Sequence, residues 1–579
     1  MSRRAFVVTS FAVAVLLAGS APARTATASV AWPREGLPVC ALPGAQYDAR
    51  VAASGGFYVL WTDERDGHPQ LYLSDVGYGP PEPTWPEGGI RIAPSDWAQG
   101  DAAVESSLGD GSCLTAWIED RGTGSGQDLY LQRYRWNGLR ASGWPEQGVR
   151  VCGALGDQAD VKLYTDGASA FLLWRDERSG NSDVYLQAIG PDGQPRAGWP
   201  ADGFAVSAGP EEELPAGMLP GLCVLWTRGG RVVLQQYDVS PGPQRSYSWP
   251  EGGFVVSDTT VFASNPVMAM SLLYFTWELA WEELRDSRAQ VRYLHLGTNF
   301  PLPVLTPAVP VAPSALSNQR RPQVLADYFG RVSVVWEDDR ADSGDIYRQL
   351  YELGGTPTIA TPQSGPEGEA VCAEAGRQRD PVVSLHIAWG DERGGPATAA
   401  IQARRLIGTT GQLSAPSLVL APAVGAQTGP SSGHYRGFCI PEACPGYDVV
   451  AWTDTRDPAT APDIYAQAFG PDVQYYFLGV PEGHAKDFAT LTPARPTPAR
   501  GTVTLSLTLP RAGDVALEVY DAAGRHVQTL VRGALPPGRH EVTWDGRGRD
   551  GGAAAPGLYF VRGRADGRPL ARRIVRLTP

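Results

Sequence analysis

One short motif recurs along most of the chain and constrains its fold more than any other feature. A tryptophan ends an apolar run, an acidic residue follows two positions later, and an arginine follows four positions later. The seven copies are Trp61/Asp63/Arg65, Trp117/Glu119/Arg121, Trp174/Asp176/Arg178, Trp281/Glu283/Arg285, Trp336/Asp338/Arg340, Trp389/Asp391/Arg393 and Trp452/Asp454/Arg456. An eighth tryptophan, Trp226, lacks both partners. Consecutive tryptophans are 52 to 63 residues apart, which indicates eight repeat units.

Each unit carries the signals of four short strands. One apolar strand ends at the tryptophan, and its hairpin partner, for example residues 128–132, follows the acid–arginine turn. A third strand follows a Trp-Pro-x-x-Gly sequence, as at residues 144–148, and an opening strand follows Gln-x-Asp, as at residues 158–160. Four antiparallel strands repeated every ~40–55 residues are typical of the blades of a β-propeller. The sequence therefore predicts an all-β fold.

An extra copy of one strand signal distinguishes a ring from a linear array. Residues 32–39 read Trp-Pro-Arg-Glu-Gly-Leu-Pro-Val and precede the first unit, whereas no clear copy follows the last unit. In a ring this early strand completes the eighth unit, but in a solenoid it is left as an unpaired edge. We therefore predict an eight-bladed β-propeller over residues 30–478, closed by an N-terminal strand.

The acid–arginine pairs lie where each hairpin reverses direction. There the carboxylate can accept backbone N–H bonds, and the guanidinium can bind the carboxylate or exposed carbonyls. The fourth unit loses both residues together, and its turn shortens to Arg228-Gly-Gly. This pattern favours a structural role for the pairs, and we predict no catalytic residue among them.

The N-terminal 28 residues predict a secretory signal peptide. Arg3 and Arg4 precede an apolar run over residues 5–18, and small residues suited to cleavage follow it. No later run reaches about 18 apolar residues, so we expect no transmembrane segment. The 62 acidic residues outnumber the 49 basic ones, for a net charge of -13, which makes nucleic acid and anionic membranes poor partners.

The seven cysteines fit an exported protein in two ways. Cys439 and Cys444 are close in sequence and are the best candidates for a disulfide in an oxidising compartment. We expect the other five to be small buried apolar residues. They are Cys40, Cys113, Cys152, Cys223 and Cys372.

The chain ends in a second module. Residues 479–500 are rich in Pro, Thr, Ala and Arg, which indicates an extended linker. Residues 501–579 contain strand signals separated by turns such as 521–524 and 545–546, and a β-sandwich is the natural packing for them.

The motifs of this module resemble a known family. They are Leu509-Pro510, Val519-Tyr520-Asp521, Gly524-Arg525, Leu530-Val531, residues 535–538, residues 544–546 and residues 556–559. The module is similar to the Ig-like domain of flagellar hook-capping (FlgD-type) proteins, which resembles the type A sorting domain of the type IX secretion system. The resemblance implies an exported or cell-surface protein of a Gram-negative-type bacterium whose C-terminal module contacts the secretion machinery. Residues 30–478 resemble secreted bacterial β-propeller repeats.

Two functions fit these features. The first is a binding module for an extracellular glycan, peptide or protein, because a ring of repeats presents loops around one axis. Asp48, Asp101, Asp160 and Asp380 open the innermost strand in four units, and together they could attract Ca²⁺ or a cationic ligand. The alternative is that each Asp caps its own loop, and we expect no other cofactor.

The second function is an extracellular glycoside hydrolase of propeller type, which needs two carboxylates flanking the cleaved bond. Acidic residues are abundant, but none has a unique place in the repeats. The sequence lacks the Ser-x-Asp-x-Gly-x-Thr-Trp boxes of sialidases and a Gly-x-Ser-x-Gly elbow. The seven histidines show no metal-binding spacing. We therefore favour binding over catalysis.

Overall fold

The chain divides into two compact units, Met1–Tyr476 and Phe477–Pro579. The computed structural model describes residues 36–577 with interruptions, of which the longer ones are 77–84, 298–303, 354–359, 435–447, 470–489 and 492–498. The predicted signal peptide and the candidate disulfide between Cys439 and Cys444 lie outside the described residues. The described part consists of strands and one short 3₁₀ helix, η1 (Pro396–Thr398), so the all-β prediction is confirmed.

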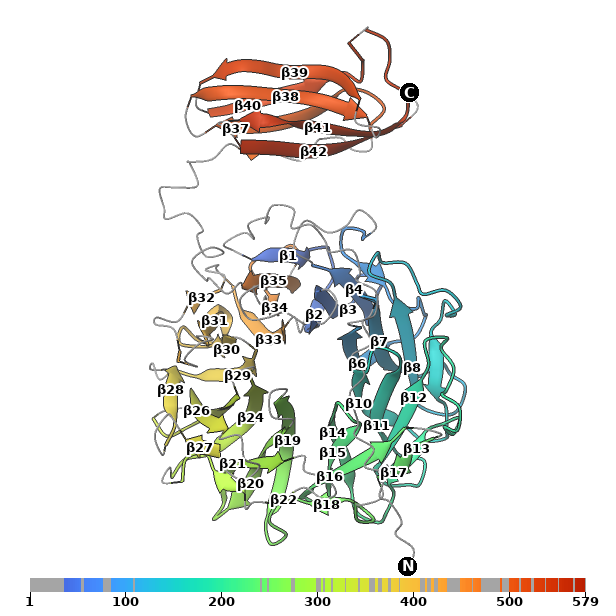
Figure 1. Ribbon diagram of the computed structural model, residues 1–579, viewed down its shortest axis with the longest axis vertical. Helices are drawn as coiled ribbons and strands as arrows, with labels where there is room; N and C mark the ends of the chain where they lie inside the picture. Colours follow the sequence, from blue (N-terminus) through green and yellow to red (C-terminus); the bar gives the residue numbers. More distant parts are fainter. Residues whose placement is uncertain are drawn as a thin grey trace, which may run out of the picture. The chain divides into compact units, whose positions relative to one another are not determined.

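Within its described residues, unit 1 contains eight antiparallel sheets that follow one another around a ring, with the first strand of each sheet innermost (Figure 1). We number them 1 to 8 along the chain. Sheet 1 consists of β2 (Gln46–Ala53), β3 (Phe57–Asp63), β4 (Gln70–Asp75) and β5 (Ile90–Arg91), and sheet 2 of β6 (Gln99–Ser106), β7 (Cys113–Glu119), β8 (Asp128–Tyr134) and β9 (Val149–Cys152). Sheet 3 consists of β10 (Gln158–Thr165), β11 (Ala170–Asp176), β12 (Asp183–Ile189) and β13 (Phe204–Ser207). Sheet 4 consists of β14 (Glu213–Leu219), β15 (Cys223–Arg228), β16 (Arg231–Asp238), β17 (Gln244–Arg245) and β18 (Phe254–Val255).

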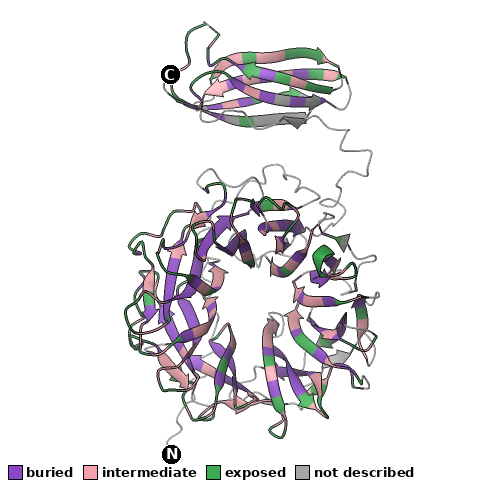
Figure 2. Ribbon diagram, turned by 180° about the vertical axis from the view of Figure 1, so that it is seen from behind, coloured by how far each residue is buried: buried purple, intermediate pink, exposed green. Residues whose placement is uncertain are grey.

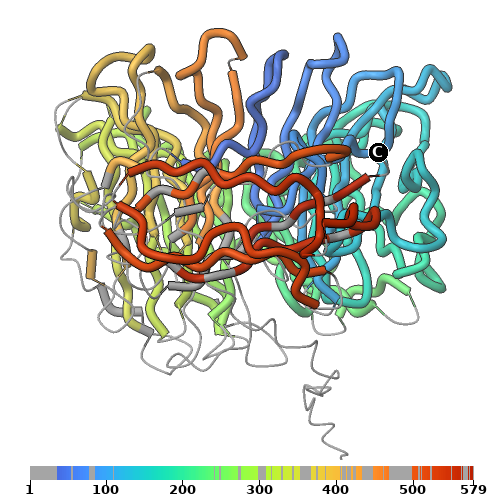
Figure 3. Tube along the Cα trace, turned by 90° about the horizontal axis from the view of Figure 1, so that it is seen from above, coloured from blue at the N-terminus to red at the C-terminus, as the bar shows by residue number. Residues whose placement is uncertain are grey.

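Sheets 5 to 8 repeat this order. Sheet 5 consists of β19 (Phe262–Ser271), β20 (Thr276–Arg285), β21 (Arg288–Gly297), β22 (Val304–Leu305) and β23 (Val309–Pro310). Sheet 6 consists of β24 (Gln319–Ala326), β25 (Arg331–Asp338), β26 (Asp345–Leu353), β27 (Ala360–Pro362) and β28 (Glu369–Cys372). Sheet 7 consists of β29 (Gln378–Val383), β30 (His386–Asp391), β31 (Ala400–Arg405) and β32 (Leu418–Val419), and sheet 8 of β33 (Gln427–His434), β34 (Asp448–Asp454), β35 (Asp463–Phe469) and β1 (Leu37–Cys40). Seen edge-on, the hairpin turns lie at two opposite faces of the ring (Figure 3).

The two ends of unit 1 meet in sheet 8. Strand β1 pairs antiparallel with β35, with Leu37 opposite Ala466 and Cys40 opposite Ile464. The next joint, between sheets 8 and 1, carries a backbone bond from Gln46 N to the Pro462 carbonyl at 2.8 Å. An equivalent bond, from Gln99 N to the Pro69 carbonyl at 2.9 Å, joins sheets 1 and 2. The first and last sheets are therefore neighbours like any other pair.

The hydrophobic cores of unit 1 lie between neighbouring sheets. One cluster joins sheets 1 and 2, another joins sheets 2 and 3, and another joins sheets 8 and 1 through residues that include Val39 and Cys40 of β1. All eight repeat tryptophans have 0% of their surface exposed, and buried residues follow the strands around the whole ring (Figure 2). Each sheet is therefore stabilised mainly by its two neighbours.

The glycine of the Trp-Pro-x-x-Gly sequence packs directly on a repeat tryptophan. Gly148 has φ +74°, and a Cβ built there would lie 2.5 Å from the ring of Trp117. At the ring closure, Gly36 has φ +82° and stands in the same relation to Trp452, at 2.9 Å. Glycine is required at this position both for its conformation and for its lack of a side chain.

Gly148→Ala is expected to destabilise unit 1 by ~2–5 kcal/mol, because it adds left-handed strain to overpacking against Trp117. Gly143→Ala is the matched control, since Gly143 has φ +86° but nothing within 4 Å of its built Cβ. The control should cost only about 1–2 kcal/mol. Chemical denaturation of both variants measures the difference, and equal losses would contradict the packing argument.

Unit 2 contains two sheets around one core. The first is β36 (Thr490–Leu491), β37 (Val503–Leu509) and β40 (Gly538–Trp544), and the second is β39 (His526–Leu535), β38 (Gly513–Asp521), β41 (Gly557–Ala565) and β42 (Arg568–Arg576). Core residues from both sheets, such as Leu505 and Leu517, belong to the same buried cluster. Strand β36 lies inside the segment predicted as a linker, and Thr490 pairs with Thr508. Strand pairing in this unit therefore begins before residue 501.

Candidate functional site

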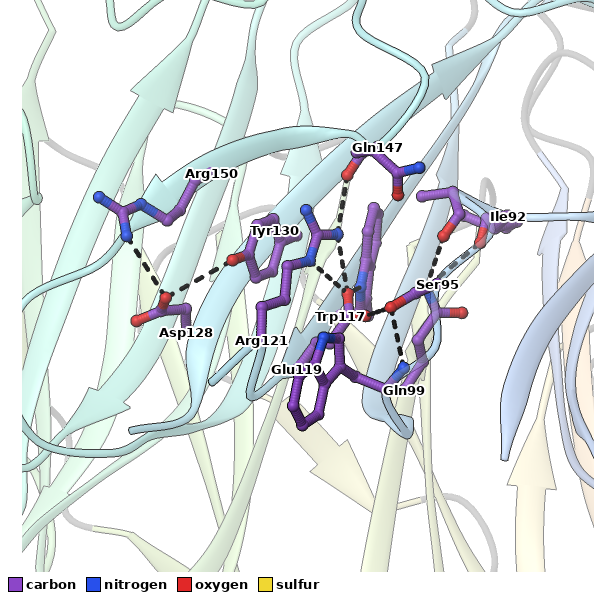
Figure 4. A network of polar contacts seen from close by, with 12 residues as sticks. Ile92, Ser95, Gln99, Trp117, Glu119, Arg121, Asp128, Tyr130, Gln147 and Arg150 are labelled. Atoms are coloured by element: carbon purple, nitrogen blue, oxygen red, sulfur yellow. Dashed lines mark hydrogen bonds and ion pairs between the residues drawn. The ribbon is translucent and has the colours of Figure 1, made fainter. Parts of the chain in front are cut away.

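The acid–arginine pair forms the centre of a polar network in each typical unit, shown for sheet 2 in Figure 4. Glu119 accepts hydrogen bonds from Trp117 Nε1 at 2.9 Å and from Arg121 Nε at 3.0 Å. The guanidinium of Arg121 also donates to the Gln147 carbonyl at 2.8 Å and lies 3.7 Å from the ring centroid of Tyr130. The pair therefore connects the second and third strands of its sheet with the turn that precedes the fourth strand.

Other units repeat these contacts. The indole-to-carboxylate bond, 2.9–3.0 Å long, occurs at Trp61–Asp63, Trp117–Glu119, Trp174–Asp176, Trp281–Glu283, Trp336–Asp338 and Trp452–Asp454. In sheet 7, Asp391 accepts from Arg393 Nε at 2.6 Å. The seven ion pairs are Asp63–Arg65, Glu119–Arg121, Asp176–Arg178, Glu283–Arg285, Asp338–Arg340, Asp391–Arg393 and Asp454–Arg456.

These carboxylates are buried and fully engaged. Burial alone would raise the pKa of Asp63, but hydrogen bonds from Arg65 and Trp61 hold that pKa below its ordinary value. The same balance lowers the pKa of Asp338, where Arg340 is the main donor. These carboxylates hold their turns through the hydrogen bonds that they accept from the neighbouring arginine.

The four aspartates named from the sequence occupy one repeated position. Asp48, Asp101, Asp160 and Asp380 are each the third residue of an innermost strand, and their φ angles are 55°, 40°, 56° and 53°. The strand register shifts at each of them. The equivalent position in the other four sheets holds Pro215, Arg321 and Gly429, each the third residue of its strand, and Asn265, the fourth residue of β19. We call these eight residues the belt.

Three of the four belt aspartates are tied to neighbouring groups. Asp101 accepts a hydrogen bond from the backbone N–H of Asp160 in the next sheet. Asp160 accepts from Arg175 Nε at 2.7 Å, and Asp380 forms an ion pair with Arg321 of the preceding sheet. In the described chain, no group of three His, Cys, Asp or Glu residues could hold a metal ion. The structure therefore does not gather all four aspartates at one point.

Two of the aspartates do share a cleft of about 390 Å³ between sheets 1 and 2. We call it the Asp48 cleft. Its lining is Tyr47, Asp48, Arg50, Leu60, Thr62, Pro69, Leu71, Ala98, Gln99, Gly100, Asp101, Ala102, Ile118 and Gln127. Leu60, Leu71 and Ile118 are buried and give it an apolar floor, whereas Asp48, Asp101 and Gln127 are exposed.

The polar groups of the Asp48 cleft are unequally satisfied. Tyr47 donates to Glu64 Oε1 at 2.8 Å, and burial together with this bond raises the pKa of Tyr47 to about 12. The side chains of Asp48 and Arg50 make no hydrogen bond or ion pair within the part of the chain that the structure describes. A carboxylate and a guanidinium, two residues apart, are thus left available.

Two small residues, Thr62 and Gly100, contribute to the lining of the cleft. In sheets 5 and 6 the residue between the tryptophan and the acid is Glu282 or Glu337, and its carboxylate accepts the backbone N–H of the next belt residue at 2.8 or 2.6 Å. In sheet 1 this residue is Thr62, which is too short for that bond. Gly100 adds no side chain on the facing strand, and a Cβ built there meets nothing within 4 Å.

Sequence reasoning named Asp48 and Asp101 but missed the rest of the cleft. Arg50, Tyr47 and the apolar floor carry no motif of their own. The short side chain of Thr62 is no signal by itself, because Thr227, Gly390 and Thr453 are as short or shorter at the same position of their repeats.

The five described cysteines, Cys40, Cys113, Cys152, Cys223 and Cys372, are all buried and unpaired with one another. Burial raises the pKa of the Cys40 thiol to about 11 and that of Cys152 to about 12. Neutral thiols are weak nucleophiles, so these cysteines offer no reactive group to a site.

Comparison with known families supports the assignment of the second unit. Residues 494–566 match the model of the FlgD Ig-like domain, which confirms the resemblance found in the sequence. No curated protein matches the chain. In the described residues, no helix is both long and apolar enough to cross a membrane.

Several solved structures are similar to the chain. One is PorZ, a bacterial surface component of the type IX secretion system of Porphyromonas gingivalis, at 13% identity and a TM-score of 0.34 over 92% of this chain and 70% of PorZ. Another is an endo-arabinase from Bacteroides thetaiotaomicron, at 13% identity and a TM-score of 0.25 over 59% of this chain and 99% of the arabinase. A third is an α-L-arabinanase from Penicillium chrysogenum, at 10% identity and a TM-score of 0.31 over 75% of this chain and 98% of the arabinanase. All these TM-scores are below 0.5.

Proposed function

We propose that the chain is an exported binding protein. In this proposal residues 1–28 are a signal peptide, residues 30–478 form an eight-bladed β-propeller that β1 closes, residues 479–500 contain the connection, and residues 501–579 form an Ig-like sandwich. The pairing of β1 with β35 and the FlgD Ig-like match support it. The protein would be secreted or held at the outer surface of a Gram-negative-type bacterium, with the second unit serving as a type A sorting module that engages the secretion machinery.

Unit 1 would bind its ligand in the Asp48 cleft. One observation carries this proposal: belt aspartates elsewhere are bonded to neighbouring groups, whereas Asp48 and its neighbour Arg50 line an open cleft without partners. Polar groups that converge on a concave site without satisfying one another are typical of ligand sites. The ligand class is an extracellular glycan, peptide or protein.

Gly100→Phe tests this site. The built Cβ of Gly100 has open space, and its φ is not in the left-handed region, so the new ring should fill the cleft without destabilising the fold. We expect binding to glycan and peptide arrays to weaken by about tenfold or more, with an unchanged melting temperature. Gly209→Phe is the matched control, because Gly209 also has open space but lies outside the cleft. Equal binding by both variants would reject the site.

One observation favours the hydrolase as a second candidate: Asp48 and Asp101, two carboxylates, line the same cleft. A panel of chromogenic glycosides, with Asp48→Asn and Asp101→Asn as variants, distinguishes turnover from binding. We propose no resident cofactor. The one ion that these two aspartates could share is Ca²⁺. If ligand binding depends on Ca²⁺, adding EDTA to the binding assay should abolish it.

A further inference from the structure

The Asp48 cleft presents two side chains of opposite charge. Asp48 and Arg50 lie two residues apart on β2, and both line the cleft. At other belt positions opposite charges satisfy each other, as Asp160 does with Arg175 and Asp380 with Arg321. At the Asp48 cleft a hydrogen-bond acceptor and a set of guanidinium donors are left side by side for a ligand.

This mixture of charges disfavours a charged ligand. An anion bound to Arg50 would lie beside Asp48 and near Asp101, which also lines the cleft. A cation bound to Asp48 would in turn lie beside Arg50. An uncharged ligand that offers both donors and acceptors avoids both penalties, and a hydroxyl group does both at once.

The shape and floor of the cleft narrow the choice further. Its volume of about 390 Å³ is at the lower end of the ~300–1,000 Å³ usual for small-ligand sites. Leu60, Leu71 and Ile118 provide an apolar floor below the polar rim. A sugar ring has the matching construction, with an apolar C–H face and hydroxyl groups around its edge.

We infer that the Asp48 cleft binds an uncharged saccharide, with Asp48 accepting from one hydroxyl and Arg50 donating to its neighbour. This inference rests on the proposed function and names its ligand class. Trp97 precedes Ala98 of the lining and is 47% exposed, so it offers an aromatic surface for further sugar units outside the cleft.

The test uses the full-length exported chain and calorimetric titration with three sets of probes: neutral oligosaccharides, uronate or sialylated oligosaccharides, and basic peptides. We expect binding to the neutral set alone. Asp48→Asn keeps a residue that tolerates the positive φ, and Arg50→Gln keeps a polar side chain; each should weaken binding by about 10- to 100-fold. Asp380→Asn, at the belt position of sheet 7, is the matched control and should bind as the unmodified protein does.

The outcomes separate this inference from the function on which it rests. If only charged saccharides or basic peptides bind, and Gly100→Phe abolishes that binding, the cleft is a binding site but the inference is overturned. If Asp380→Asn weakens saccharide binding as much as Asp48→Asn, the assignment to the cleft is also overturned. If Gly100→Phe changes the binding of no probe, the proposed function itself fails.

Discussion

Removal of residues 1–41 is expected to lower the free energy of unfolding of unit 1 by roughly 5–9 kcal/mol. The deletion takes away the burial of Val39 and Cys40 and the hydrogen bonds between β1 and β35. It also leaves β35 as an open edge, which invites aggregation. A native domain is stable by only about 5–15 kcal/mol, so most of the folded population should be lost. Thermal and urea denaturation measure the effect.

Two further variants make this result specific to the strand. A variant lacking only residues 1–30 keeps β1 and should unfold as the unmodified protein does. A variant that carries residues 30–42 behind β35, through a short flexible turn, should recover most of the loss because β1 and β35 run antiparallel. If the deletion leaves the melting temperature unchanged, β1 does not close the ring.

Trp117→Ala is expected to cost about 3–5 kcal/mol, the usual range for truncating a large buried aromatic residue. Trp117 is fully buried, stacks on Tyr130 with ring centroids 5.7 Å apart, and supports Gly148. The substitution leaves a cavity in the buried cluster between sheets 1 and 2. Urea denaturation followed by tryptophan fluorescence and circular dichroism measures the loss.

Replacement by phenylalanine separates the hydrogen bond from the packing. Trp117→Phe removes the indole donor and leaves the buried Glu119 with one bond fewer. In sheet 4, Trp226 has no acid partner, and its Nε1 makes no hydrogen bond in the described structure. Trp226→Phe should therefore cost less than Trp117→Phe by about 1–3 kcal/mol. Equal costs would show that the indole bond contributes nothing to stability.

The sequence predicts the sheets well because their signals are local and repeated. A tryptophan followed by an acid two residues later and an arginine four residues later marks the end of a strand and a turn in all seven copies. The early copy at residues 32–39 indicates a long-range pairing for the same reason, since it matches a strand that sheet 8 otherwise lacks. Strand β36 was missed because two residues carry no periodic pattern.

The candidate site was harder to predict because it depends on what a repeat lacks. Asp48 resembles Asp160 and Asp380 in sequence, but their environments differ through residues elsewhere in the chain, namely Arg175 and Arg321. Thr62 and Gly100 line the cleft from neighbouring sheets, and their proximity is visible only when these sheets are placed side by side. Sequence patterns report the residues present in one segment and not the space between two segments.

The pairing of Cys40 with Ile464 also means that the ring can close only late in synthesis. Strand β1 leaves the ribosome first, yet its partner is synthesised almost at the end of unit 1, and such distant contacts form slowly. Until β35 has been synthesised, β1 has no partner strand. Two nascent chains at high concentration can exchange their β1 strands, so that β1 of one chain pairs with β35 of the other. Chaperones that bind the segment containing β1 should therefore suppress domain-swapped dimers.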